Sequence, residues 1–166
     1  MNDSISCRKA SKPDLREILR LYAQPEMDNG KVLSITEAER ILEKIEAYPD
    51  YAIYVAVYRD EIIGSFGLLI MNNLGHLGAP SAVIEDVVVD PKWQRQGVGK
   101  MMMQRALQIC EEKGCYKATV SSNLKRERAH AFYTALGFEF YGYSFQIKGQ
   151  SEFAPDRGKT AAPGET

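Results

Sequence analysis

The sequence of 166 residues has few of the features that mark several protein classes. Its 21 basic and 22 acidic residues nearly cancel, and no long run of either sign occurs, so we expect no nucleic-acid partner. Apolar stretches stay under about ten residues, whereas a membrane-spanning helix needs about 20, so we expect no membrane partner. The two histidines, His76 and His130, are far apart and have no ligand spacing, so no metal site is expected.

Cysteine is also scarce and lacks C-x-x-C spacing, with Cys7, Cys110 and Cys115 odd in number. The chain opens Met-Asn-Asp-Ser, which has none of the apolar core of a signal peptide. Together these features predict a protein of the reducing cytoplasm. Residues 149–166 have little apolar content and are predicted to be a disordered polar tail, so residues 1–148 remain as a single domain.

Hydrophobic periodicity in that domain predicts alternating strands and helices. Thr36 and Glu39 have capping-box spacing and are expected to begin the second helix, while Asp60-Glu61 is expected to be a tight hairpin turn. The order β-α-α-β-β-β-α-β-α-β predicts an α/β protein with a mixed sheet covered by helices. Strands are expected over residues 5–10, 51–59, 62–71, 82–90, 117–121 and 138–147, and helices over 12–22, 37–48, 98–113 and 127–136.

The segment 86–100, DVVVDPKWQRQGVGK, combines an apolar strand, a polar turn and two glycines at the start of a long helix. Free N–H groups at a helix N-terminus carry the positive end of the helix dipole and suit a phosphate. Gly97 and Gly99 would let a ligand approach the backbone closely, and Arg95 and Lys100 add positive charge. The segment therefore predicts a polyphosphate site.

The spacing of the glycines separates three motifs that could occupy such a turn. A P-loop would need glycine and a hydroxyl where the chain has Gln94 and Met101. A dinucleotide fingerprint would need its third glycine at Met102. The spacing Q-x-x-G-x-G is met by Gln94, Gly97 and Gly99, with a purely structural glycine turn as the remaining alternative.

Two segments together resemble a known family. Q-x-x-G-x-G after the strand VIEDVVVD resembles the pyrophosphate-binding signature of the GNAT acetyltransferases, and NLKRERAHAFYTALGF resembles their second signature. The resemblance covers most of residues 5–147 and implies the acyl-CoA N-acyltransferase fold, a mixed, mostly antiparallel sheet with a splayed parallel strand pair and helices on both faces. The matching residues of the second signature are Asn123, Ala129, Phe132, Tyr133, Gly137 and Phe138.

The resemblance implies acetyl-CoA as cosubstrate, without a metal. Backbone N–H groups of residues 95–100 would bind its diphosphate, and the open backbone of residues 87–89 would pair with the pantetheine arm. The residues implied to bind acetyl-CoA are Val87, Val88, Val89, Gln94, Arg95, Gln96, Gly97, Val98, Gly99, Lys100, Asn123, Ala129 and Phe132.

Acetyl transfer to an amine needs a base, a donor to the oxyanion and an acid for the leaving thiolate. The resemblance implies Tyr133 as the acid, and a phenol with a pKa near 10 is protonated at neutral pH; a packing role is the alternative. Glu85 and Asp86 are the candidate bases. Strand alternation sends them to opposite faces, so that one faces the cleft, and Glu85 is preferred. The oxyanion donor is expected to be a backbone N–H at Val88 or a neighbour.

The acceptor amine is less well defined, because the resemblance is weakest in the first two helices and in the loop 72–80. The strings IEDVVV and S-x-x-x-x-R-x-x-A-H-x-F-Y resemble enzymes acting on amino sugars, aminoglycosides or aminoalkyl phosphonates, which favours a small primary amine. His76 is a candidate substrate contact, and His130 is expected to be packed or exposed. Arg126 and Arg128 are candidates for the 3′-phosphate of CoA or an anionic substrate, with solvated side chains at a helix end as the alternative. A protein or peptide N-acetyltransferase and a noncatalytic acyl-CoA-binding module are the alternatives, and the resemblance is compatible with a homodimer.

Overall fold

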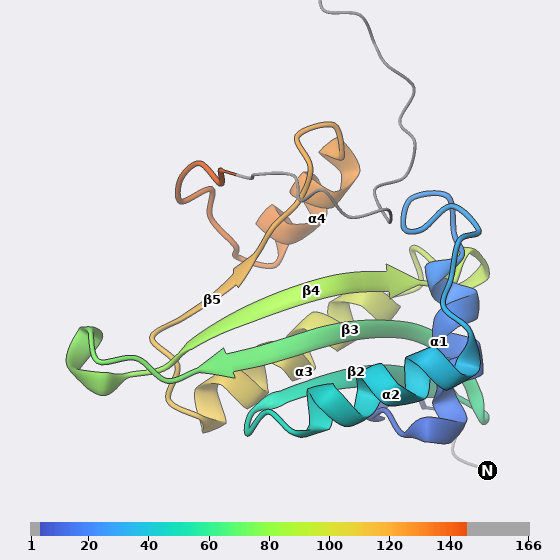
Figure 1. The fold of residues 1–166 in the computed structure, drawn as a ribbon. Helices are drawn as coiled ribbons and strands as arrows, with labels where there is room; N and C mark the ends of the chain where they lie inside the picture. Colours follow the sequence, from blue (N-terminus) through green and yellow to red (C-terminus); the bar gives the residue numbers. More distant parts are fainter. Residues whose placement is uncertain (1–3, 146–166) are drawn as a thin grey trace, which may run out of the picture.

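The computed structural model describes residues 4–145, which form a five-stranded sheet with its strands in chain order (Figure 1). Neighbouring strands are antiparallel except β4 and β5, which are parallel. The predicted mixed, mostly antiparallel sheet is therefore confirmed. The strands are β1 (Ser6–Lys9), β2 (Tyr51–Tyr58), β3 (Glu61–Met71), β4 (Ser81–Val89) and β5 (Lys117–Val120).

Helices cover both faces of the sheet, with α1 and α2 on the near face in Figure 1 and α3 behind it. In Figure 1, helix α4 lies above β4, on the side toward which β5 turns away from β4. No helix in the described part of the chain is both long and apolar enough to cross a membrane. The helices are α1 (Leu15–Tyr22), α2 (Ile35–Glu46), α3 (Val98–Glu112) and α4 (Glu127–Ala135), with short 3-10 turns η1 (Lys12–Asp14), η2 (His76–Gly78) and η3 (Pro91–Trp93).

The core is divided between the two faces of the sheet. On the α3 face, Phe66 and Ile84 pack with Met102 in the larger cluster of buried side chains. On the α1 face, Ile18 of the helix packs with Val88 of β4. Strand β4 is thus buried on both faces, as its continuous apolar run predicts.

Two local predictions are displaced along the chain. The N-cap of the second helix is Ser34, not Thr36. Glu37 N–H donates to Ser34 Oγ over 3.3 Å, and Ser34 N–H donates to the Glu37 carboxylate over 3.0 Å. This pair has the same spacing as Thr36 and Glu39, so the spacing alone cannot choose between them. The β2–β3 turn consists of Arg59 and Asp60, both with positive φ, one residue earlier than predicted.

The predicted last strand is wrong for the residues that the structure describes. Residues 138–145 have no regular secondary structure, and their aromatic side chains at positions 140, 141, 143 and 145 are 79% to 94% exposed. Aromatic alternation indicates only that a segment would fit a pleated surface, and within residues 4–145 no strand pairs with the outer edge of β5. Positions 146–147 of this strand and the tail 149–166 lie outside the described residues.

Candidate functional site

The parallel pairing of β4 and β5 stops halfway along β4. The ladder runs from Ser81 opposite Lys117 to Ile84 opposite Val120, and β4 then continues to Val89 with β3 as its only partner strand within residues 4–145. The predicted splayed pair is therefore present, with one open edge on β4. This open edge begins where residues 85–89 leave the ladder.

The direction of the peptide groups on this edge follows from one hydrogen bond. Asp90 N–H donates to Ile63 O over 2.9 Å, so the alternation of an antiparallel ladder turns the Val89 peptide groups away from β3. Val89 O accepts instead from two side-chain amides, Gln24 Nε2 at 3.3 Å and Gln94 Nε2 at 3.2 Å. The same alternation directs the Val88 peptide groups toward β3.

A β-bulge interrupts β4 at the two candidate bases. The register pairs Gly67 with Glu85 and Ser65 with Val88, which leaves Asp86 in an extra position, with φ of 52°. Residue faces change across the bulge, because Ile84 packs on the α3 face and Val88 packs on the α1 face. Strict alternation would have placed these two side chains on the same face.

The bulge corrects the prediction that Glu85 and Asp86 lie on opposite faces. Glu85 follows Ile84 and therefore lies on the α1 face, and Asp86 lies near Tyr22, since its charge raises the pKa of that phenol. Both carboxylate residues line one cavity of about 110 Å³. The sequence pattern missed this because the extra residue breaks the period of two.

The cavity lies where β4 and β5 separate. Its apolar walls come from Met27, Ile84, Val87 and Val120. Its polar walls are Glu85, Asp86, Ser121, Arg126 and Tyr133. The structure therefore brings the predicted acid and both predicted bases together in one cavity.

Tyr133 enters this cavity from α4. Its ring packs edge-on against Phe132 and Phe138, with centroids 5.2 Å and 5.6 Å away. Burial raises the pKa of Tyr133, Arg126 lowers it and the charge of Glu85 raises it, with burial the largest effect. The phenol is therefore protonated at neutral pH, as a proton donor must be.

The two carboxylates have pKa values above their ordinary range. Burial is the larger cause for both; the charge of Asp86 adds to it at Glu85, and the charge of Asp28 adds to it at Asp86. Both side chains keep contact with solvent. A carboxylate whose pKa is raised is a stronger proton acceptor when ionised than a free one.

The turn before α3 has the geometry expected of an anion site. Gly97 caps the helix with φ of 84°, and a Cβ at this position would meet no atom within 4 Å. The first helical hydrogen bond runs from Met101 N–H to Gly97 O, 3.0 Å, so the N–H groups of residues 98–100 have no partner within the helix. These residues fit a diphosphate.

The second glycine, Gly99, also lies against helix α4. A Cβ on Gly99 would lie 3.2 Å from the ring of Phe132, so glycine here lets α4 pack closely on the start of α3. The side chains of Gln94 and Gln96 bond to backbone oxygens of the turn, Val89 O and Lys92 O. Together with Arg95, whose φ is 60°, they shape the turn that holds Lys100 at the start of α3.

The second signature forms the turn into α4. Asn123 Oδ1 accepts from Lys125 N–H over 2.9 Å, and Asn123 O lies 3.0 Å from His130 Nε2. Ala129 N–H donates to Arg126 O over 2.9 Å in the first turn of the helix. Asn123 thus organises the chain between β5 and Tyr133.

His76 is not among the residues that line the cavity. Its ring stacks on Tyr116, with centroids 3.9 Å apart, where the loop 72–80 meets the start of β5. His76 and Leu77 both have positive φ. Within residues 4–145, no group of three or more His, Cys, Asp or Glu side chains could hold a metal ion.

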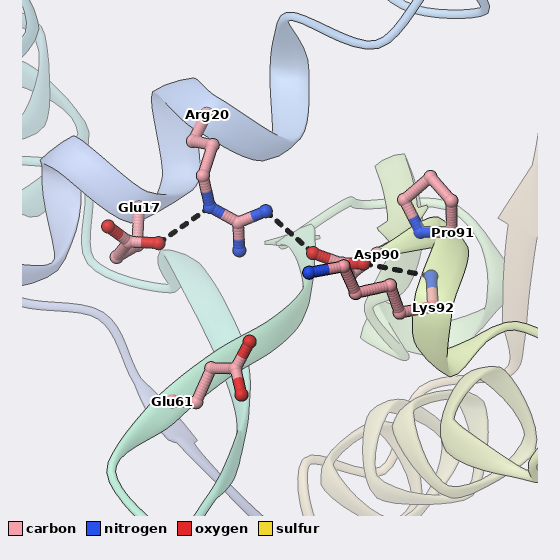
Figure 2. A pocket seen from close by; sticks show the side chains of 6 residues that line it. All are labelled: Glu17, Arg20, Glu61, Asp90, Pro91 and Lys92. Atoms are coloured by element: carbon pink, nitrogen blue, oxygen red, sulfur yellow. Dashed lines mark hydrogen bonds and ion pairs between the residues drawn. The ribbon is translucent and has the colours of Figure 1, made fainter.

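A larger hollow of about 420 Å³ lies between α1 and the end of β4, lined by charged side chains (Figure 2). Arg20 bonds to Asp90 Oδ2 and Glu17 Oε2, both at 2.6 Å, and Asp90 Oδ1 accepts from Lys92 N–H. These groups largely satisfy one another, and none of the predicted acid or base residues lines the hollow. The smaller cavity is therefore the candidate active site.

The fold defines a class, the acyl-CoA N-acyltransferase fold, and the cavity lies at its splayed strands. Residues 13–138 match the acetyltransferase (GNAT) family, and the chain belongs to that family.

The chain is similar to glucosamine 6-phosphate N-acetyltransferase of Trypanosoma brucei brucei, 39% identical over 77 residues, which are 46% of this chain and 50% of that protein. It is also similar to aminoglycoside N(6')-acetyltransferase type 1 of Stenotrophomonas maltophilia, 31% identical over 65 residues, 39% of this chain and 42% of that protein. The chain thus spans about half the length of the curated relatives it matches.

Among solved structures, an acetyltransferase of Trypanosoma brucei superposes with a TM-score of 0.76 at 27% identity, covering 87% of this chain and 99% of that one. This likeness extends over the whole described fold.

Three residues near the cavity were not found from the sequence. Tyr22 ends α1, and burial together with the charge of Asp86 raises its pKa to about 12. Met27 lines the cavity and Asp28 follows it in the α1–α2 loop. Tyr22 carries an apolar-stripe signal, but no motif points to the loop residues.

Proposed function

We propose that this protein is an N-acetyltransferase that moves the acetyl group of acetyl-CoA to the primary amine of a small molecule. The observation that carries the proposal is the cavity at the end of the β4–β5 ladder, lined by Tyr133, Glu85 and Asp86. The N-acetyltransferases among the relatives, named for amino-sugar and aminoglycoside acceptors, support it.

Acetyl-CoA would be held by backbone groups. The N–H groups of residues 98–100 suit its diphosphate, with Arg95 and Lys100 adding charge. The open edge of β4 offers the Val89 N–H to the pantetheine arm, while two glutamine amides hold Val89 O. Because the register turns Val88 toward β3, the N–H that binds the oxyanion belongs to one of its neighbours, Val87 or Val89.

Bound acetyl-CoA supplies an activated acetyl thioester. The Glu85 carboxylate accepts a proton from the acceptor ammonium, directly or through one water, which frees the nitrogen lone pair. As the N–C bond forms and the C–S bond breaks, Tyr133 Oη gives its proton to the departing sulfur. The nitrogen then loses its second proton, which returns to the Tyr133 phenolate through solvent, and Glu85 releases the first proton to solvent, so the products are the amide, the free thiol and one proton.

A thiol-release assay with acetyl-CoA and a panel of amines tests the proposal, with calorimetric titration of coenzyme A as an independent binding measurement. Turnover on free amines is expected. Turnover on peptides alone would identify a peptide N-acetyltransferase instead. Binding without turnover on any acceptor would leave a noncatalytic acyl-CoA-binding module.

A further inference from the structure

The acceptor side of the cavity carries a surplus of negative charge. Glu85 and Asp86 both line it, and the one lining cation, Arg126, lies 3.8 Å from Glu26. Glu26 therefore shares the positive charge of Arg126 with the cavity. Apart from Arg126, no residue that lines the cavity is basic, so the two strand carboxylates outnumber the lining cation.

A third carboxylate lies beside these two, on the loop that follows α1. Asp28 comes directly after the lining residue Met27, and its charge raises the pKa of Asp86, which places the two carboxylates within electrostatic range. The side chain of Asp28 is exposed, so a bound molecule can reach it.

The loop that carries Asp28 is held in place. Asp28 N–H donates to Tyr22 O and Lys31 N–H donates to Asp28 O, both at 3.0 Å. Tyr22 and Met27 pack against the buried cluster that contains Val88 of β4. Asp28 therefore has a fixed position relative to the open half of β4.

Polar groups without charge complete this side of the cavity. The phenols of Tyr22 and Tyr51 lie near Asp86, whose charge raises the pKa of both. The Ser65 hydroxyl is fully buried on the same face of the sheet, beside Tyr22. Hydroxyl groups of this kind accept hydrogen bonds from ammonium groups as well as donating to carboxylates.

We propose that the acceptor carries a second cationic group, which Asp28 and Asp86 bind while the reacting amine lies between Glu85 and Tyr133. The inference rests on the proposed function and narrows its substrate to di- and polyamines, including amino sugars with several amines, and excludes phosphorylated amines. Asp28 is then the residue that selects the acceptor.

The charge balance explains the selection. A second ammonium group placed between Asp28 and Asp86 gains two charge-assisted hydrogen bonds and relieves their mutual repulsion. A phosphate in the same place would add a dianion to three carboxylates, with Arg126 already paired to Glu26. Like-charge contact of this kind lowers affinity for the wrong acceptor.

Two matched acceptor pairs test the proposal with the full chain at saturating acetyl-CoA and low ionic strength. The first pair is 1,5-diaminopentane and 1-aminopentane, and the second is glucosamine and glucosamine 6-phosphate. We expect kcat/KM to favour the diamine by about 10-fold or more, since hydrogen bonds to charged groups have roughly this effect. Glucosamine is expected to exceed its phosphate.

The variant Asp28→Asn should raise KM for the diamine about 10-fold and leave kcat and the monoamine KM unchanged. Asparagine keeps both backbone hydrogen bonds of the loop, so folding is preserved. Glu111→Gln removes the same charge from α3 on the opposite face and should change neither preference.

A preference for glucosamine 6-phosphate, or an equal rate with both pentane amines, would overturn the acceptor class while the acetyltransferase activity stands. A diamine preference that survives Asp28→Asn would overturn the role of Asp28. Absence of thiol release with every acceptor would instead overturn the proposed function, and the acceptor class with it.

Discussion

The two halves of β4 show how one strand can belong to both the core and the candidate active site. Residues 81–84 pair with β3 and β5 and alternate regularly, with Ala82 and Ile84 fully buried. Residues 85–89 pair with β3 alone and contain a bulge at Asp86. The paired half, 81–84, supplies stability, and the open half, 85–89, supplies a strand edge that no strand in the described residues pairs with and two carboxylates that line one cavity.

The comparison predicts that a change in the paired half affects stability more than chemistry. Ile84→Ala removes a fully buried side chain between β4 and α3, and we expect the free energy of unfolding to fall by about 3 kcal/mol. Denaturant unfolding measures this effect. Ile84 also contributes to the cavity wall but carries no ionisable group, so kcat per folded molecule should fall far less than in Tyr133→Phe. A loss of kcat as large as that of Tyr133→Phe would end the distinction between the halves.

The largest effect on kcat is expected for Tyr133, which lines the cavity together with Glu85 and Asp86 of the open half. Tyr133→Phe keeps the ring contacts with Phe132 and Phe138 and removes the proton donor, so kcat should fall on the order of 10²-fold with little change in the acetyl-CoA KM. Steady-state kinetics measure both constants. Tyr141→Phe, on an exposed side chain, is the matched control. An unchanged kcat would rule out the acid role.

A smaller effect is expected at the base, because Asp86 remains next to it. Glu85→Gln should lower kcat about 10-fold. Burial and Asp86 raise the pKa of Glu85, so wild-type activity should fall with decreasing pH at a higher pH than a free glutamate would give. The variant should lose this acidic limb of the pH–rate profile. If Asp86→Asn removes this acidic limb and Glu85→Gln does not, the base is Asp86 and not Glu85.

The smallest effect is expected for Gln94, whose side-chain amide donates to Val89 O on the open edge of β4. Gln94→Ala removes one of two donors to Val89 O, an exposed hydrogen bond of about 1 kcal/mol. We expect the acetyl-CoA KM to rise about 3-fold with kcat and stability nearly unchanged. Gln104→Ala, on the exposed surface of α3, is the control. A KM that does not change in Gln94→Ala would show that Gln24 alone positions this carbonyl.

The paired half could be predicted from the sequence, and the open half only in part. The apolar run of β4, the glycine turn and the long helix after it were all predicted, because each depends on local periodicity and turn chemistry. The bulge at Asp86 was not, because an extra residue in a strand has no signal in the alternation of an apolar run. This one feature placed both carboxylates on the same face.

The cavity itself depends on contacts between distant segments. Tyr133 was found through its helix signature, but Met27 and Asp28 belong to a loop whose sequence, PEMDNGK, shows only that a turn is present. The last predicted strand failed for a related reason, since aromatic alternation in residues 138–145 does not provide a neighbour for pairing. Local sequence patterns do not indicate which distant segments of the chain contact each other.

The Arg20 side chain in Figure 2 connects the segments that carry the proposed acceptor site and the proposed acetyl-CoA site. This side chain links α1, whose C-terminal loop carries Asp28, to Asp90, the first residue after the open half of β4 and the start of the turn toward α3. Because Arg20 connects α1 to the end of β4, a movement of α1 would also displace the turn between β4 and α3. With the proposed sites for acetyl-CoA and the acceptor, we expect binding of one substrate to favour binding of the other, that is, positive cooperativity.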